Sequence, residues 1–445
     1  MIRTKCSIRL PKTFVKLLLE LKPNFTKPSF KYFETLIAGI LLGEPKKTVT
    51  AAVKLARLEK KFSNVHRFVS RYRWDSGQLG MGVLKLIIKT LDLSKHQSLT
   101  FALDSTLLAK FGSKIFGCAY HFNSAQKRNT ARYVWGHYWL VMGLLHFSET
   151  FKKWLCLPFL AQLFVSQKAL SKGATYKSTI DLACDMVQML KGKIKQKVIL
   201  VADGYFAKQK LLRTCAQTGV TLISRLQSNA ALYQAPKSLR GPKPRGRPRK
   251  YGKKLASLKM IAKKSKGFTE LTLKLYGKER CVKVKRFEAL WKPAGQSIDV
   301  LIVFYEKAKK PTFFFCTDPS LSTEAILTRV AARWSIESLF KDLKEHLGWS
   351  DWQCRVEKAV SRSATLTCSA ASLLTIWSLQ QASSRQPELW DVVPWYTNKS
   401  IPSFQDMLEQ LRCQTLETTF LAIQRSGQTM QKKEAQYRQL MRLAA

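Results

Sequence analysis

The sequence is poor in acidic residues. It contains 29 Asp and Glu against 76 Lys and Arg, so its formal net charge is +47. This excess of positive charge favours a polyanionic partner, and nucleic acid is the first candidate. The hydrophobic fraction is 46%, with 24 Phe, so the chain can bury a hydrophobic core. The positive charge therefore belongs to a folded protein and not to a disordered basic tail. The 445 residues suffice for one large domain with additional modules.

Long apolar runs are also missing. The best candidates, Leu366–Leu379 and Trp139–Leu145, fall short of the roughly 20 residues that a transmembrane helix needs. The N-terminal region has no clean signal peptide, because Lys16 and Glu20 interrupt its apolar stretch. We therefore expect a protein of the bacterial cytoplasm, associated with the nucleoid and without a membrane partner.

Two further motifs are absent. The ten cysteines include no C-x-x-C pair, which disfavours structural zinc, and a reducing compartment disfavours disulfides. We interpret them as packed thiols. A Walker loop is missing because Gly112-Ser113-Lys114 and the segment 43–48 lack the required spacing of glycine and lysine. The sequence thus gives no indication of nucleotide hydrolysis.

The first hundred residues have a helical pattern. Helical spacing of apolar residues in Lys47–Lys61 is followed by a second segment, Asn64–Tyr72, which we expect Ser63 to cap. This second segment leaves three arginines for phosphate contacts, namely Arg67, Arg71 and Arg73. Two interpretations stay open: a helix-turn-helix that reads specific DNA, and a plain helical bundle with a solvated basic face.

Between residues 98 and 225 the pattern changes to strands, and then to alternating helices and strands. Helices are predicted at Lys177–Leu190 and Ala207–Gln217. Strand-type apolar runs lie at Ser98–Leu103, Tyr133–Phe147, Trp154–Phe164, Lys197–Ala202 and Val220–Arg225. This order predicts an α/β fold with a mixed sheet and helices on its faces.

A second β-rich region interrupts that pattern. After Leu226, a stretch rich in Pro, Gly and Lys precedes further strand-type runs, at Thr269–Tyr276, Arg280–Leu290, Ser297–Tyr305 and Thr312–Cys316. We interpret this region as an inserted β domain. Beyond it, Thr323–Leu347 is predicted to form one long helix, capped by Ser322 or Thr323 and ended by Gly348. The rest of the chain has a helical pattern.

Two aspartates follow apolar runs of the strand type. Asp104 follows Leu99–Leu103, and Asp203 follows Val198–Ala202. We expect both acids at the C-terminal ends of core strands, where open α/β sheets place their sites. The alternative is that each aspartate only begins a turn, for which Asp203-Gly204 is a typical dipeptide.

A third acid, Glu337, lies in the predicted long helix. At about 100° per residue, Arg333, Glu337 and Lys344 project within roughly 60° of one another. A carboxylate can bind a divalent metal while Arg and Lys hold neighbouring phosphates, as phosphodiester chemistry requires. An exposed helix with ordinary ion pairs is the alternative, and the spacing alone leaves it open.

Three short segments carry these residues in a fixed order: Asp104-Ser-Thr, then Val-Ala-Asp203-Gly-Tyr-Phe, then Arg333-Trp-Ser-Ile-Glu337 with Lys344 seven residues later. This order resembles the IS4-like family of DDE transposases over the central two-thirds of the chain. The family signature has a Tyr three residues before the Arg, and Val330 occupies that position here. The phosphate contact that the family makes with this phenol is therefore missing.

The resemblance implies an RNase H-like catalytic domain in which Asp104, Asp203 and Glu337 bind two Mg²⁺ (or Mn²⁺) ions. It implies a transposase of an insertion sequence that cuts element ends and joins them to target DNA by hydrolysis and transesterification. Arg333, Trp334 and Lys344 would contact DNA. For Trp334 the expected contact is stacking on a displaced base, and a buried core indole is the alternative. A homodimer that bridges two double-stranded ends, and a hairpin intermediate, are further expectations.

The spacing of the acids fits an insertion, because the interval from Asp203 to Glu337 is too long for one crossover. Members of the resembled family carry an insertion at that point. The expected division is a helical DNA-binding region at 1–95, a catalytic domain at 96–225 and 317–385, an inserted β-rich domain at 226–316, and a helical C-terminal region at 386–445.

The stretch Lys237–Lys266 contains thirteen Lys or Arg and no acid. Its centre, Pro-Arg245-Gly-Arg247-Pro followed by Arg249 and Lys250, is similar to an AT-hook, which fits the narrow minor groove of A·T-rich DNA. A basic loop that only pairs with phosphates is the alternative.

Two other functions of the whole chain stay open: a non-catalytic AT-hook DNA-binding or architectural protein, and an RNase H-like nuclease without strand transfer.

Overall fold

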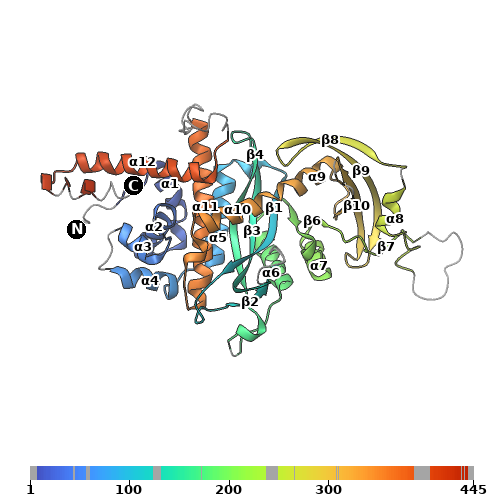
Figure 1. The fold of residues 1–445 in the computed structure, drawn as a ribbon, viewed down its shortest axis with the longest axis horizontal. Coiled ribbons are helices and arrows are strands. Elements are labelled where there is room, and N and C mark those ends of the chain that lie inside the picture. The colour runs from blue at the N-terminus through green and yellow to red at the C-terminus, as the bar shows by residue number, and fades with distance from the viewer. Residues whose placement is uncertain are drawn as a thin grey trace.

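A computed structural model of the chain describes residues 8–438, except 44–45, 57–60, 124–131, 172, 237–248, 265, 307, 309, 385–400, 432 and 435. It confirms the α/β class: a large mixed sheet is flanked by helices, and both terminal regions are helical. Figure 1 shows helices α1–α4 at one end and strands β8–β10 at the other, with strands β1, β3 and β4 between them.

The N-terminal helices pack around one long helix from the C-terminal part of the chain. That helix is α11 (Glu357–Ser384), which contacts β4 and four of the helices α1–α5, and also packs against α12 (Phe404–Gln424) (Figure 1). The N-terminal helices are α1 (Lys12–Glu20), α2 (Lys27–Leu42), α3 (Val49–Leu55), α4 (Phe62–Ser70) and α5 (Ser76–Thr90). No helix among the described residues is long and apolar enough to cross a membrane.

Helix α4 corrects one expectation. Ser63 was expected to cap a helix that begins at Asn64, but α4 begins at Phe62, and its N-cap residue Lys61 makes no side-chain cap hydrogen bond. Ser63 lies inside the first turn and is therefore not in a capping position. The predicted polarity of the helix is confirmed, because Val65, Phe68 and Val69 are buried. Three arginines of this region are exposed, as expected: Arg67, Arg71 and Arg73.

In the described part of the chain, eleven strands form one sheet with the order β2-β3-β1-β5-β6-β11-β10-β9-β7, in which β4 also pairs with β3 and β8 with β9. The strands of the first half are β1 (Ser98–Ala109), β2 (Ala119–Phe122), β3 (Tyr133–Ser148), β4 (Lys153–Phe164), β5 (Lys197–Ala202) and β6 (Val220–Arg225). Helices α6 (Thr179–Lys191) and α7 (Gln209–Thr218) follow β4 and β5 in the chain and contact each other. The predicted strands Lys197–Ala202 and Val220–Arg225 are confirmed residue for residue.

Strand β5 is buried on both faces, as its unbroken apolar sequence predicts. Val198 and Leu200 belong to the main hydrophobic core, which extends to the N-terminal helices. Ile199 and Val201 point to a second core, which α9 (Thr323–Ala332) covers with Ile326 and other residues. The strand that ends in Asp203 is therefore fixed from both sides.

The second β-rich region continues the central sheet. Its strands are β7 (Leu232–Tyr233), β8 (Thr269–Leu275), β9 (Lys278–Trp291), β10 (Gln296–Tyr305) and β11 (Thr312–Cys316). Strand β11 pairs antiparallel with β6, so the added strands extend the sheet beyond β6 instead of forming a sheet of their own. The division of the chain into domains at residues 95, 225, 316 and 385 stays a prediction.

The helix expected at Thr323–Leu347 is not continuous. It is split into α9, ending at Ala332, and α10 (Ser335–Glu345), with Arg333 and Trp334 between them. At the break the backbone switches to tighter hydrogen bonds, from Trp334 N to Ala331 O and from Glu337 N to Trp334 O. Such tightening of a single turn changes the direction of a helix without any Pro or Gly, and local sequence patterns do not reveal it.

Of the two predicted ends of this helical segment, the first is confirmed and the second lies earlier in the chain than predicted. The Ser322 side chain accepts a hydrogen bond from Ala325 N, so the predicted cap is confirmed. At the other end α10 stops at Glu345, before the expected Leu347, and Gly348 adopts a left-handed φ of +56° in the turn that follows. Glycine is the residue that adopts this conformation without steric cost.

Candidate nuclease site at the edge of the sheet

Two aspartates lie side by side at one edge of the sheet. Strands β1 and β5 are parallel, with Leu103 opposite Ala202, so Asp104 and Asp203 occupy the next positions along the two strands. Asp203 directly follows β5, as predicted. Asp104 corrects the prediction, because β1 continues to Ala109 by pairing with β3, and Asp104 therefore lies where the parallel pairing ends, not where the strand ends.

Arginine 333 connects two of the three acids. Its Nη1 donates to Asp104 Oδ2 at 2.5 Å, and its Nη2 donates to Glu337 Oε1 at 3.0 Å. One guanidinium thus joins an acid of β1 to an acid of α10, across more than two hundred residues of sequence. The break between α9 and α10 puts Arg333 at the end of α9 and Glu337 in the first turn of α10.

The pKa of Asp104 is set by its burial and by the charged groups around it. Burial raises the pKa of Asp104 to about 6, Arg333 and the Ser105 amide oppose this rise, and the charges of Asp203 and Glu337 add to it. All three carboxylates therefore interact at this edge of the sheet. Their mutual repulsion is the kind that a bound cation relieves.

The three acids provide the carboxylate oxygens that Mg²⁺ and Mn²⁺ prefer. In the described part of the chain, however, no three acidic, His or Cys side chains are close enough together to hold a metal ion as they stand. Arg333 supplies the positive charge between Asp104 and Glu337 instead. The donor set fits a divalent metal, provided that the Arg333 side chain moves.

The remaining expected DNA contacts lie in different surroundings. Trp334 is 54% exposed, so it is not a core indole. Lys344 is partly buried, and this burial lowers its pKa. Arg249 and Lys250 are exposed, whereas Arg245 and Arg247 lie outside the described residues.

Sequence reasoning missed Arg225. This exposed residue ends β6, the neighbour of β5, and lines two cavities together with Asp203. The smaller cavity, about 240 Å³, also contains Val330, Arg333 and Trp334. The signal was present in the sequence, because Arg225 follows its apolar run in the same way that Asp203 follows the neighbouring one.

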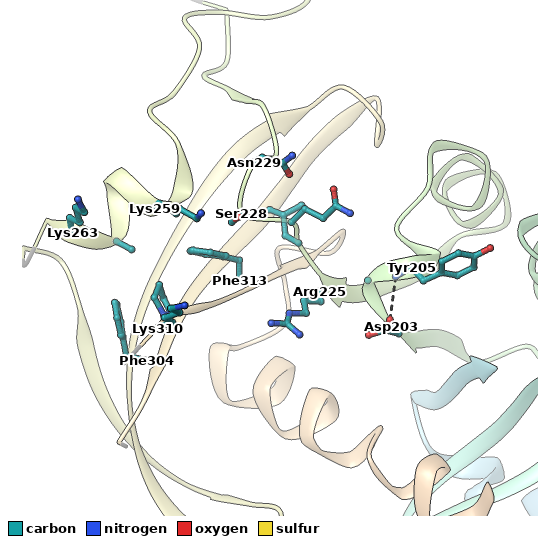
Figure 2. Close-up of a pocket in the computed structure, with 15 residues that line it drawn as sticks. Asp203, Tyr205, Arg225, Ser228, Asn229, Lys259, Lys263, Phe304, Lys310 and Phe313 are labelled. Atoms are coloured by element: carbon teal, nitrogen blue, oxygen red, sulfur yellow. Dashed lines mark hydrogen bonds between the residues drawn. The ribbon is translucent and has the colours of Figure 1, made fainter. Parts of the chain in front are cut away.

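The larger cavity lies on the other side of Arg225 and measures about 1260 Å³. Figure 2 shows Asp203 and Tyr205 at one end of it, joined by the hydrogen bond from the Tyr205 amide to Asp203 Oδ2 at 3.4 Å. Lys263 and Phe304 lie at the opposite end. The acidic site therefore opens directly into a wide groove.

An α/β protein with clustered carboxylates at a sheet edge, beside basic grooves, belongs to the class of enzymes that act on nucleic acids. The comparison with protein families identifies the family within this class. Residues 20–280, more than half of the chain, match the DDE superfamily endonucleases, and the chain belongs to this family. The match includes Asp104 and Asp203 and ends before Glu337. No curated protein matches the chain.

Membership in this family defines the general activity. The protein is a nuclease or transposase type of enzyme, and DNA is its substrate. The mixed sheet and its helices agree with the RNase H-like domain that such enzymes use.

Proposed function

We propose that this protein is the transposase of an insertion sequence, similar to the IS4-like family, which cuts the ends of its element and joins them to target DNA. The observation that carries the proposal is that Arg333 joins Asp104 to Glu337, while Asp203 follows the strand that pairs parallel with that of Asp104. Acids from two neighbouring strands and one helix thus lie at the same edge of the sheet.

Asp104, Asp203 and Glu337 would hold two Mg²⁺ (or Mn²⁺) ions. When bound, such ions activate an attacking oxygen and stabilise the leaving oxygen of an in-line displacement. The side chains of the protein do the positioning. Arg333 can exchange its carboxylate partners for a phosphate oxygen, since a guanidinium binds both with the same paired geometry.

Two other groups near Arg333 would contact the element end. The exposed Trp334 offers a flat surface for stacking on a displaced base. The partly buried Lys344 has no hydrogen bond or ion pair with any described residue, so its ammonium is available for a phosphate. Val330 occupies the position of the signature tyrosine and lines the smaller cavity with Tyr276 and Tyr305. Phenols therefore remain present in this cavity, although the signature phenol is missing.

The regions outside the site would bind the rest of the DNA. Residues 1–95 form a helical DNA-binding region in this proposal, with the exposed arginines of α4 against phosphates. The hook-like stretch with Arg245, Arg247, Arg249 and Lys250 would enter a minor groove. A homodimer that bridges two element ends, and a hairpin intermediate, belong to the same proposal.

The decisive experiment uses variants of nearly equal size. With the genomic DNA that flanks the coding sequence and Mg²⁺, we expect Asp203→Asn and Glu337→Gln each to lower the cutting rate at least about 1,000-fold, because each removes a charged metal ligand. DNA binding should persist in both variants. The control is Asp185→Asn, since Asp185 lies in α6 and pairs with Lys177 at the surface.

Full Mg²⁺-dependent cutting by both variants would contradict the proposal. A protein that binds DNA but cuts none, with or without metal, would favour the architectural alternative. Joining of precut ends to a plasmid separates a transposase from a nuclease that only cuts.

A further inference from the structure

The larger cavity beside the acidic site is a basic groove. Four cations line it, Arg225 from β6, Lys259 and Lys263 from α8 (Leu258–Lys263), and Lys310 from the connection before β11. We call it the lysine groove. Figure 2 shows Lys259, Lys263 and Lys310 gathered on the side opposite Asp203, with Arg225 between them and the acid.

The cations of the lysine groove have no acidic partner in the described part of the chain. All four cations are exposed, and none forms an ion pair with an acid of the described residues. Among the described residues that line the groove, Asp203 is the single acid. Four cations kept together without acidic partners repel one another, so the arrangement favours a polyanionic occupant.

The other residues of the groove suit a nucleic-acid backbone. Ser228 and Asn229 follow Arg225 and offer hydrogen bonds, and Phe304 and Phe313 form an apolar floor (Figure 2). The basic stretch returns to the described structure at Arg249 and leads into α8, which carries two of the groove lysines. The described part of the basic stretch, from Arg249 onward, is therefore joined through α8 to the groove that reaches Asp203.

Two cavities meet at Asp203 and Arg225. The smaller one contains Arg333 and Trp334, the residues assigned above to the element end. The lysine groove shares Asp203 and Arg225 with the smaller cavity and extends from them in another direction. In an in-line displacement the attacking and leaving oxygens lie on opposite sides of the phosphorus, so two DNA segments must reach the acids from different directions.

We propose that the lysine groove holds the target DNA during the joining step. The proposal rests on the transposase function proposed above and adds to it the place of the second substrate. Lys259, Lys263 and Lys310 bind target phosphates, and Arg225 separates this DNA from the element end. The attacking 3′-hydroxyl of the element end forms a new phosphodiester with a target phosphorus, and the broken target strand leaves with its own 3′-oxygen, which takes up a proton.

The test is the triple variant Lys259→Ala/Lys263→Ala/Lys310→Ala of the full chain. Its matched control is Lys168→Ala/Lys193→Ala/Lys195→Ala, which removes three exposed lysines that lie outside both the groove and the N-terminal DNA-binding region. Each protein is given a fragment of the flanking genomic DNA, to measure cutting, and a precut fragment with a supercoiled plasmid, to measure joining. Binding of the plasmid alone is measured at several salt concentrations.

We expect the groove variant to cut within about twofold of the unaltered protein and to join at least about tenfold more slowly. The slope of log affinity for plasmid against log salt should fall by about 2 to 3, because each lost phosphate contact removes nearly one released counterion. Unchanged joining would overturn the proposal. Equal losses of cutting and joining would also overturn it, since the groove would then hold the element end. If the unaltered protein cuts nothing, the transposase function fails, while the plasmid slope still shows whether the groove binds DNA.

Discussion

A buried arginine and a partly buried arginine of this protein have opposite kinds of partners. Arg362 of α11 is 4% exposed and donates to four backbone carbonyls, those of Phe68, Val69, Tyr72 and Trp74, while its guanidinium lies 4.4 Å from the centre of the Trp74 ring. Arg333 donates to two carboxylates at the sheet edge. One cation is held by neutral groups of the main chain, and the other by charged side chains.

The difference indicates which arginine is structural. Phe68 and Val69 belong to the last turn of α4, whose carbonyls find no N–H donor within the helix. Arg362 donates to both, and the Trp74 indole N–H donates to the Phe68 carbonyl as well. Arg362 therefore fixes the end of α4 against α11 permanently. The carboxylates that hold Arg333 can bind a cation from solution instead, so this contact can be exchanged during a reaction.

The largest effect is expected from removing the structural arginine. Arg362→Ala removes a donor from four carbonyls, of which that of Phe68 keeps the Trp74 indole N–H, and it removes the contact with the Trp74 ring. We therefore expect the free energy of unfolding to fall by about 3–5 kcal/mol. Urea unfolding followed by tryptophan fluorescence measures this. Arg67→Ala, at an exposed position of α4, is the control and should change the free energy by less than about 0.5 kcal/mol. A change below about 1 kcal/mol for Arg362→Ala would remove the distinction between the two arginines.

The matching change at the acidic site should affect activity more than stability. For Arg333→Ala we expect Mg²⁺-dependent cutting to fall about 100-fold, which corresponds to the loss of one charged phosphate contact of about 2–3 kcal/mol. The free energy of unfolding should fall by only about 1 kcal/mol. Lys341→Ala, which removes an exposed ion pair with Glu345 on α10, is the control. A loss of stability as large as that of Arg362→Ala, with cutting retained, would make Arg333 a second structural arginine.

A smaller effect is expected from pH, through Asp104. Its pKa is raised from 3.8 to about 6, mainly by burial, so the folded protein holds this proton more tightly than the unfolded chain does. The resulting stabilisation is fully present below about pH 4 and is lost as the pH rises through 6. Between pH 4 and 7 we expect the unaltered protein to lose on the order of 2 kcal/mol relative to Asp104→Asn.

Urea unfolding of both proteins across this range measures the difference. The same proton competes with a metal ion for Asp104, so cutting should also decrease below about pH 6. Parallel pH profiles of unfolding for the two proteins would show that Asp104 does not titrate in this window.

Much of the catalytic framework was predictable because it depends on local patterns. Strands β5, β6 and β11 were predicted with their observed bounds, since unbroken apolar runs between turn signals are typical of strands that are buried on both faces. The position of Asp203 follows from the end of β5. The break at Arg333 and Trp334 was not predictable, because no Pro or Gly marks it and both helices continue a normal helical pattern.

The sequence by itself determined which segments become strands and helices, where the positive charge lies, and that acids follow two core strands. These properties depend on neighbours along the chain. Only the tertiary structure decided that β6 pairs with β11, that Arg333 joins Asp104 to Glu337, and that Arg225 lies between two cavities. Each of these contacts unites residues far apart in sequence, and their geometry depends on how the whole sheet and its helices pack.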